Sequence, residues 1–280
     1  MSNTEQQDFW TDEAGPTWVA RMQTMDRTLA PVLDRVLADA ELQAGDRVLD
    51  IGCGAGTSTV AAARQVGDAG GACGLDISRS LLDHARGLAA DHKNVSFVLG
   101  DAQTHDFGPD RFDAMISRFG VMFFADTTAA FANIAGGLRP GARLTFATWG
   151  EIAENPYFTM PAGIAKQVIG APPKTDPEAP GPFAMRDTRK VVAQLGGAGL
   201  RDIAASEVTL PLTPPGDAQK VAELMCDIGP AHRALTHFEA GPQERARLCN
   251  ALAEGLAPYA TPDGIRIPAL INIFTARTAG

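Results

Sequence analysis

Long apolar runs are missing from this 280-residue chain: no stretch of about 18 consecutive apolar residues occurs, so a membrane-spanning helix is not expected. The first ten residues, MSNTEQQDFW, are polar and acidic, unlike the basic and apolar start of a secretory signal. Together these two features predict a cytoplasmic protein with no membrane partner.

Basic clusters are also missing. The chain has 24 Lys and Arg against 33 Asp and Glu, a net charge of −9, and its basic residues are scattered. Nucleic-acid-binding proteins normally present a basic stripe that displaces counterions, so no nucleic-acid partner is expected. The acidic balance is better matched to a small or cationic ligand.

Cysteine is sparse. Cys53, Cys73, Cys226 and Cys249 form no CxxC pair and no Cys/His ligand spacing. Metal sites built on cysteine normally show such spacings, so no metal site is expected. Because the chain shows no export signal, we interpret the four cysteines as reduced thiols.

What the sequence does contain is a regular alternation of short apolar runs and helical segments between residues 46 and 148. This pattern predicts an α/β fold with a mostly parallel sheet and helices on both faces. The predicted strands are Arg47–Ile51, Ala72–Ile77, Val95–Leu99, Phe112–Ser117 and Arg143–Thr148. The helices are expected to begin near Thr57, Thr127 and Ser78, the last being an N-cap, and turns are expected at Gly136-Gly137 and Pro140-Gly141.

The flanking segments are less regular. Residues 16–40 are predicted as helix, split or kinked at Pro31, and the proline-rich residues 170–182 as a loop. Further helices are expected over 187–198, 217–235 and 242–259, and strands over 202–212 and 265–277. The predicted organisation is therefore N-terminal cap helices at 1–45, a core at 46–150, and a segment 151–280 that completes the sheet and inserts substrate-cap helices.

The most informative segment is VLDIGCGAGT at residues 48–57, where a strand ends at Asp50 and a glycine-rich turn follows. Glycines let the backbone bend sharply and approach a ligand closely, and this end of a strand is where open α/β sheets bind ligands. A dinucleotide-binding turn has glycine where this chain has Thr57, and Asp50 would repel a pyrophosphate. A nicotinamide-dependent oxidoreductase is thus the disfavoured alternative, and an ordinary strand-to-helix turn is a second one.

Two further carboxylates follow the next two predicted strands. Asp76 is placed to accept hydrogen bonds from ribose hydroxyls. Asp101, followed by Ala102, could accept a hydrogen bond from an adenine amino group. Each aspartate alone could equally be a helix cap, but three carboxylates at three successive strand ends favour a ligand.

Together these motifs resemble those of the class I S-adenosylmethionine-dependent methyltransferases. The resemblance covers residues 45–150 and includes FDAMIS at 112–117 and LRPGARLTFATW at 138–149. It is closest to the small-molecule branch that includes quinone-biosynthesis enzymes. It implies a Rossmann-like sheet of seven strands with the last one antiparallel, a small helical cap, and S-adenosylmethionine as cofactor, with S-adenosylhomocysteine as product.

The resemblance also implies roles for individual residues, grouped by the part of the cofactor that they face. These are Asp50 and the glycine turn with Gly52, Cys53 and Gly54 for the methionine portion, Asp76 for the ribose, Asp101 and Ala102 for the adenine, Ser117, Arg118 and Phe119 for the sulfonium, and Trp18 and Met22 as a cover. Thr57 and Ile77 are expected as further cofactor-binding residues. For Trp18, core packing is an equal alternative.

The acceptor is less readable. We expect in-line methyl transfer to a small organic molecule, with His232 as a candidate general base, and the sequence leaves a homodimer open. A cofactor-binding protein without catalysis is a further alternative. The apolar residues after the fourth strand, Phe119 and 122–124, could line an acceptor pocket or fill the core. The tetrapeptide NPYF at 155–158 is similar to a signature of nucleobase methyltransferases, but it follows the fifth strand and lacks the second proline, so we interpret it as a loop start.

Overall fold

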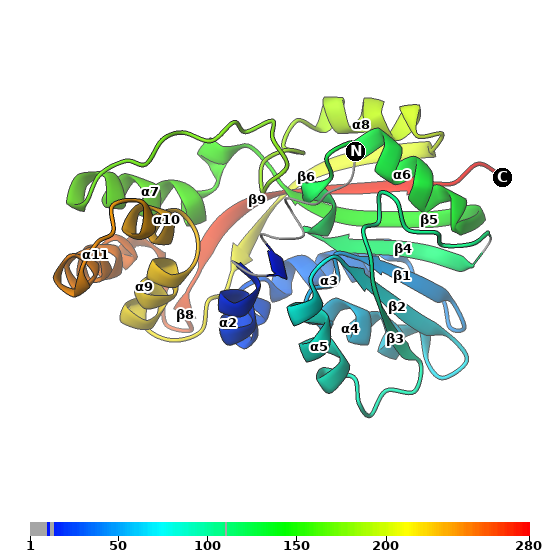
Figure 1. Cartoon of the computed structure of the whole chain (residues 1–280), viewed down its shortest axis with the longest axis horizontal. Helices are drawn as coiled ribbons and strands as arrows, with labels where there is room; N and C mark the ends of the chain where they lie inside the picture. Colours follow the sequence, from blue (N-terminus) through cyan, green and yellow to red (C-terminus); the bar gives the residue numbers. More distant parts are fainter. Residues whose placement is uncertain (1–9, 12–13, 110) are drawn as a thin grey trace.

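A seven-stranded sheet forms the centre of the computed structural model, which describes residues 10–11, 14–109 and 111–280 (Figure 1). The strands lie in the order β3-β2-β1-β4-β5-β9-β6, and β9 runs antiparallel to both of its neighbours. Their bounds are β1 Arg47–Ile51, β2 Gly71–Asp76, β3 Val95–Leu99, β4 Phe112–Arg118, β5 Leu138–Trp149, β6 Arg201–Leu212 and β9 Ile267–Arg277. The predicted fold is confirmed, and the strand order reverses between β1 and β4, where such sheets bind ligands.

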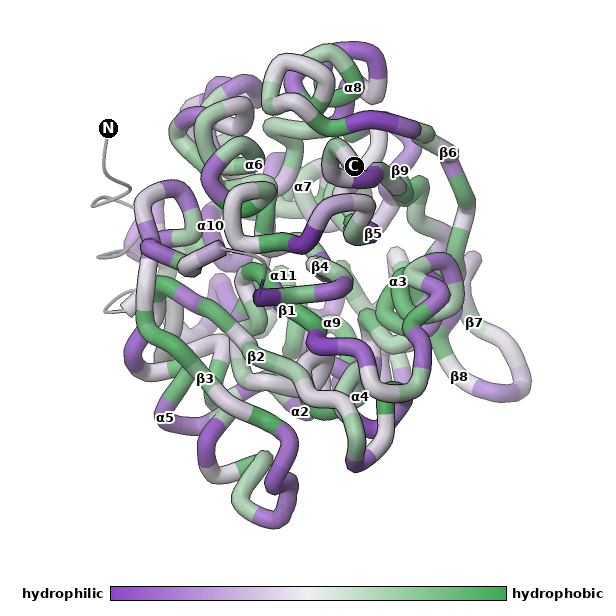
Figure 2. The backbone as a smooth tube through the Cα atoms, turned by 90° about the vertical axis from the view of Figure 1, so that its right-hand side faces the viewer, coloured by the Kyte–Doolittle hydropathy of each residue, from purple (hydrophilic) through white to green (hydrophobic). Residues whose placement is uncertain are grey.

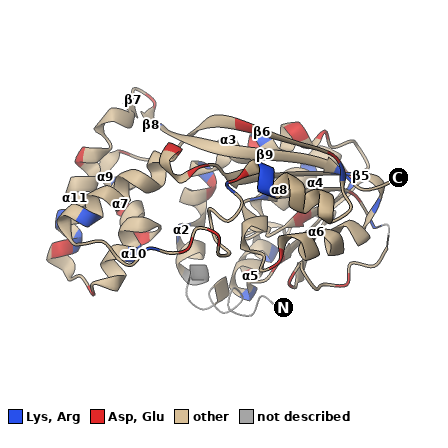
Figure 3. Cartoon of the chain, turned by 90° about the horizontal axis from the view of Figure 1, so that it is seen from above, with Lys and Arg blue, Asp and Glu red and all other residues tan. Residues whose placement is uncertain are grey.

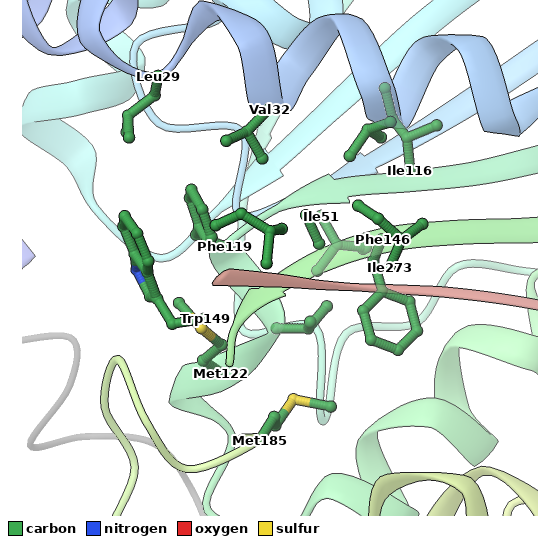
Figure 4. Packing of buried hydrophobic residues seen from close by; sticks show 14 of the residues in the cluster. Leu29, Val32, Ile51, Ile116, Phe119, Met122, Phe146, Trp149, Met185 and Ile273 are labelled. Atoms are coloured by element: carbon green, nitrogen blue, oxygen red, sulfur yellow. The ribbon is translucent and has the colours of Figure 1, made fainter. Parts of the chain in front are cut away.

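The predicted strands were recognisable because helices cover both faces of the sheet. In β1, all four residues after Arg47 are buried. In Figure 4, Leu29 and Val32 reach the strands from one side of the sheet, while Met122 and Met185 lie on the other side. Burial on both faces removes the polar alternation of a half-exposed strand and leaves a continuous apolar run.

The helices around the sheet largely follow the prediction. They are α2 Ala14–Thr28, α3 Ala30–Ala40, α4 Thr57–Val66, α5 Arg79–Leu88, α6 Thr127–Gly136 and α8 Thr188–Gly197. Pro31 separates α2 from α3 as expected, and it stands in the first turn of α3, where its missing N–H costs nothing. Ser78 caps α5 by accepting a hydrogen bond from the Leu81 N–H, which confirms the expected N-cap.

A group of helices lies to one end of the sheet (Figure 1). It comprises α7 Pro156–Val168, α9 Ala218–Asp227, α10 Pro230–His237 and α11 Pro242–Gly255, which pack on one another. A hairpin, β7 Ala260–Thr261 and β8 Gly264–Ile265, follows and projects from the molecule as a pale to purple, hydrophilic loop (Figure 2). None of the described helices is long and apolar enough to cross a bilayer. Lys and Arg residues are interspersed with Asp and Glu residues along the chain (Figure 3).

Three local predictions were wrong. NPYF at 155–158 begins helix α7, because Pro156 fits a first helical turn. The helix expected over 217–235 is two helices, since Gly229 has a φ of +92° and interrupts the first. Pro140-Gly141 lies within β5, where the pairing with β4 is irregular and tolerates a proline.

Candidate functional site

The glycine turn after β1 is shaped by left-handed backbone conformations: φ is +65° at Gly52, +56° at Gly54 and +90° at Gly56. The N–H groups of Gly52 and Cys53 donate to the Leu75 carbonyl, at 2.8 and 3.2 Å, and so tie the turn to β2. A Cβ at Gly52 would lie 2.5 Å from the Gly120 Cα, whereas a Cβ at Gly54 would meet nothing within 4 Å. Gly52 is therefore needed for packing, and Gly54 borders open space.

Asp50 is fully buried beneath this turn. The hydroxyls of Ser58 and Thr59, in the first turn of α4, both donate to its Oδ2 at 2.6 Å. Its other oxygen, Oδ1, is buried and has no hydrogen-bond partner among the described residues. Burial raises the pKa of Asp50 to about 6, against the lowering effect of the two hydroxyls and of nearby Arg118. A buried carboxylate oxygen without a partner is stabilised when a hydrogen-bond donor or a cation binds to it.

Asp76, at the end of β2, is hydrogen-bonded to the glycine turn. Its Oδ2 accepts from the Gly54 N–H at 2.7 Å and its Oδ1 from the Ser78 N–H at 2.8 Å. Burial raises its pKa, opposed by these bonds and by one from the Ile77 N–H. A carboxylate has about four acceptor positions, so room for ribose hydroxyls remains. The structural role as a brace for the turn was not predicted.

The Asp101-Ala102 pair forms a tight corner after β3. The Asp101 carboxylate accepts from the Gln103 N–H at 2.9 Å, and its carbonyl accepts from the His105 N–H at 2.8 Å. The Asn133 side chain donates to the Ala102 carbonyl at 2.9 Å. This corner therefore has a fixed backbone at the same edge of the sheet as the glycine turn.

Ser117 and Arg118 lie at the end of β4, next to the end of β1. The Ser117 hydroxyl donates to the Ile51 carbonyl at 2.7 Å and accepts from the Gly120 N–H at 3.1 Å. Arg118 is in register to share a face of the sheet with Asp50, because its second neighbour, Ile116, pairs with Asp50.

Asp26 of α2 joins two of the predicted residues. Its Oδ1 accepts from Arg118 Nη2 at 2.6 Å and its Oδ2 from the Thr57 hydroxyl at 2.5 Å. A second Arg118 nitrogen, Nη1, is buried and has no hydrogen-bond partner among the described residues. Sequence reasoning missed Asp26, because no local pattern distinguishes it from a solvated helix residue.

Aromatic rings border the site. Phe119 has a φ of +69° and stacks on Trp149 at the end of β5, with 4.5 Å between ring centroids and 4° between planes. Trp10 packs edge-on against Trp18 and Phe123, and its carbonyl accepts from the Ser78 hydroxyl at 2.8 Å. The N-terminal region thus reaches from the end of β2 to the segment after β4, across β1.

Two other predicted residues are buried. Met22 is 6% exposed and Cys53 is 5% exposed. Burial and the neighbouring carboxylates raise the pKa of the Cys53 thiol well above its ordinary value, so it stays neutral.

His232 lies in α10, with Nδ1 3.2 Å from the Cys226 carbonyl. It borders a surface pocket of about 400 Å³ together with Arg21 and Asp227, which form an ion pair. Arg21 and Asp26 are five positions apart on α2 and so point in different directions. No described contact brings His232 to the glycine turn, and its role as a base stays a prediction. The described residues contain no group of three or more side chains that could hold a metal ion.

Comparison with known proteins decides what this arrangement is. Residues 48–141, from β1 through the start of β5, match the family model described as a methyltransferase domain. Residues 48–141 form a methyltransferase domain. The match begins at the strand before the glycine turn and includes the predicted ribose and adenine positions.

Relatives of this methyltransferase domain act on different molecules. Aklanonic acid methyltransferase DauC of Streptomyces sp. (strain C5) is 36% identical over 118 residues, which cover 41% of this chain and 54% of that protein. Demethylmenaquinone methyltransferase of Staphylococcus aureus is 33% identical over 107 residues, which cover 38% of this chain and 44% of that protein. The matching segment spans about half the length of these curated relatives.

Solved structures agree on the fold. The YcgJ protein of Bacillus subtilis superposes with a TM-score of 0.54 at 18% identity, over 89% of this chain and 98% of that chain. Phosphoethanolamine N-methyltransferase 2 of Haemonchus contortus, solved with S-adenosyl-L-methionine, has a TM-score of 0.53 at 18% identity, over 89% of this chain and 52% of that chain. At such identities the likeness concerns the fold of the methyltransferase domain.

Proposed function

We propose that this protein transfers a methyl group from S-adenosylmethionine to a small organic acceptor. One observation carries the proposal. Asp50 Oδ1 and Arg118 Nη1 are buried atoms of opposite charge, each without a hydrogen-bond partner among the described residues. They lie beside the same turn, and together they match the ammonium and carboxylate groups of the cofactor's methionine portion. We therefore assign Arg118 to the carboxylate and not, as the resemblance implied, to the sulfonium.

The other predicted residues fit the rest of the cofactor. Asp76 retains acceptor capacity for ribose hydroxyls, and the corner at Asp101 and Ala102 offers a carboxylate and a backbone for the adenine. Gly54 borders open space where a ligand can approach the backbone. Trp18 and Met22 on α2 would cover the bound molecule.

When bound, S-adenosylmethionine supplies a methyl carbon on a positively charged sulfur that is already a good leaving group. The protein's task is then to align donor and acceptor and to exclude water. Phe119 and Trp149 provide an apolar wall at the ends of β4 and β5. A general base such as His232 is required only for an acceptor that carries a proton at the reacting atom.

The nicotinamide alternative fits poorly. A pyrophosphate at the start of α4 would meet the Asp50 carboxylate beneath the turn, and the first residue of that helix is Thr57, already bonded to Asp26. The acceptors in the relatives' names, aklanonic acid and demethylmenaquinone, support a small-molecule acceptor.

Turnover tests the proposal. Purified protein is incubated with S-adenosylmethionine and a panel of phenolic, quinonoid and carboxylic acceptors, and S-adenosylhomocysteine is measured by mass spectrometry. We expect acceptor-dependent release that is lost in Asp50→Asn. Tight cofactor binding without release for any acceptor in the panel would favour the non-catalytic alternative.

A further inference from the structure

The tetrapeptide NPYF at 155–158 is fixed against the end of the sheet. Asn155 is fully buried, and its Nδ2 lies 2.9 Å from the Glu151 carbonyl and 3.3 Å from the Leu270 carbonyl. Asn155 thereby anchors the start of α7 to the segment after β5 and to β9. The side chains that follow it, Tyr157 and Phe158, are held in place relative to the sheet.

Tyr157 belongs to a row of parallel rings that begins at the candidate site. Its ring lies 3° from the plane of Trp149, with 6.3 Å between centroids, and Trp149 lies 4° from the plane of Phe119. Phe119 directly follows Arg118 at the end of β4, and Figure 4 shows it beside Trp149. The row leads from the end of β4 to α7, and its three rings are buried.

The Tyr157 hydroxyl has an unusually weak partner. The side chain is buried, and among the described residues its only hydrogen-bond partner is the thioether sulfur of Met25, at 3.8 Å. A buried tyrosine hydroxyl normally finds an oxygen or nitrogen, since a thioether accepts poorly. Burial raises the pKa of Tyr157 to about 12, so the hydroxyl keeps its proton and remains a donor. It points at α2, the helix that also carries Met22 and Trp18.

We infer that Tyr157 donates a hydrogen bond to an oxygen of the methyl acceptor, a flat ring that binds beside this row of aromatic side chains. The inference rests on the proposed function and specifies its substrate class: a planar conjugated ring that bears a carbonyl or enolate oxygen. In the free protein the Tyr157 hydroxyl donates to the Met25 sulfur. When the substrate binds, the hydroxyl donates to the substrate's oxygen instead, because oxygen accepts a hydrogen bond more strongly than a thioether sulfur does. Tyr157 transfers no proton. Its hydrogen bond orients the substrate ring and stabilises negative charge on the substrate's oxygen.

The chain offers a matched control, because it contains only two tyrosines, Tyr157 and Tyr259. Tyr259 lies in the short turn before β7, and its backbone carbonyl accepts from the Arg266 N–H at 2.8 Å. Tyr157→Phe and Tyr259→Phe each remove one phenolic oxygen and keep the ring. Melting temperatures verify that both variants fold.

Binding is measured by calorimetry on protein saturated with S-adenosylhomocysteine, with 2-hydroxy-1,4-naphthoquinone as the oxygen-bearing probe and naphthalene as the oxygen-free one. We expect Tyr157→Phe to weaken quinone binding about tenfold, with naphthalene binding unchanged, and Tyr259→Phe to change neither. Unchanged quinone affinity in Tyr157→Phe, or no quinone binding by the wild type, would overturn the inference. S-adenosylhomocysteine titrations of the same proteins separate the two proposals, because loss of that binding in the wild type contradicts the proposed function itself.

Discussion

Arg118 is held by Asp26 through a 2.6 Å ion pair that uses one guanidinium nitrogen and leaves Nη1 buried. The same carboxylate accepts from the Thr57 hydroxyl, so α2 is bonded both to the end of β4 and to the start of α4. This arrangement fixes the direction of Arg118 before any ligand binds. Asp26 is thus a positioning residue for the proposed contact with the cofactor's carboxylate.

Asp26→Asn should weaken S-adenosylhomocysteine binding by about 1–2 kcal/mol, because an amide replaces a charged partner that aligns Arg118. Calorimetry measures the change. The control is Asp39→Asn, which removes a carboxylate from an ion pair with Arg35 on α3. Equal affinities for all three proteins would show that Asp26 does not position Arg118.

The stability of the free protein should depend on the protonation of Asp50. Its pKa is raised from 3.8 to about 6, so the folded state binds this proton more tightly than the unfolded state. The contribution to stability is complete below about pH 4 and is lost as the pH rises through about 6. The side chain of Asp50→Asn does not titrate. As the pH rises over this range, the free energy of unfolding of the variant should therefore increase relative to that of the wild type by up to about 3 kcal/mol.

Urea unfolding at pH values from 4 to 7 tests this expectation. Asp68→Asn, a substitution of an exposed aspartate in the turn after α4, serves as the control and should follow the wild type. Parallel pH profiles for Asp50→Asn and the wild type would mean that Asp50 carries no raised pKa.

Asp76→Ala should weaken S-adenosylhomocysteine binding by about 1–3 kcal/mol, because it removes both the proposed ribose acceptor and the brace on Gly54. The substitution also leaves the Gly54 and Ser78 N–H groups without an acceptor, so urea unfolding should show a loss of stability. An unchanged dissociation constant would contradict the ribose assignment.

Two glycines of the turn should respond differently to alanine. Gly52→Ala places a Cβ against the Gly120 backbone and should destabilise the protein by about 3 kcal/mol. Gly54→Ala meets no protein atom, so its cost to stability should be about 1 kcal/mol of backbone strain. Its Cβ enters the space assigned to the ligand and should weaken binding about tenfold. Equal affinity for Gly54→Ala and the wild type would place the ligand elsewhere.

Much of the core could be predicted from the sequence, because its signals are local. The bounds of β1 and β3 follow from continuous apolar runs, and the start of α5 follows from its Ser78 cap. Helix α7 was missed because Pro156 and Pro161 resemble loop residues, although the first fits an N-terminal turn. Asp26 could not be found, because its partners lie 31 and 92 residues away in the chain. Contacts of that range depend on the folded chain.

The central claim is that buried charges beside the glycine turn bind S-adenosylmethionine and its product. Calorimetric titration of the wild-type protein with S-adenosylhomocysteine, and separately with NADH, tests it most directly. The account predicts one S-adenosylhomocysteine bound per chain, weaker binding by Asp50→Asn, and no binding of NADH. Binding of NADH together with indifference to S-adenosylhomocysteine would contradict it.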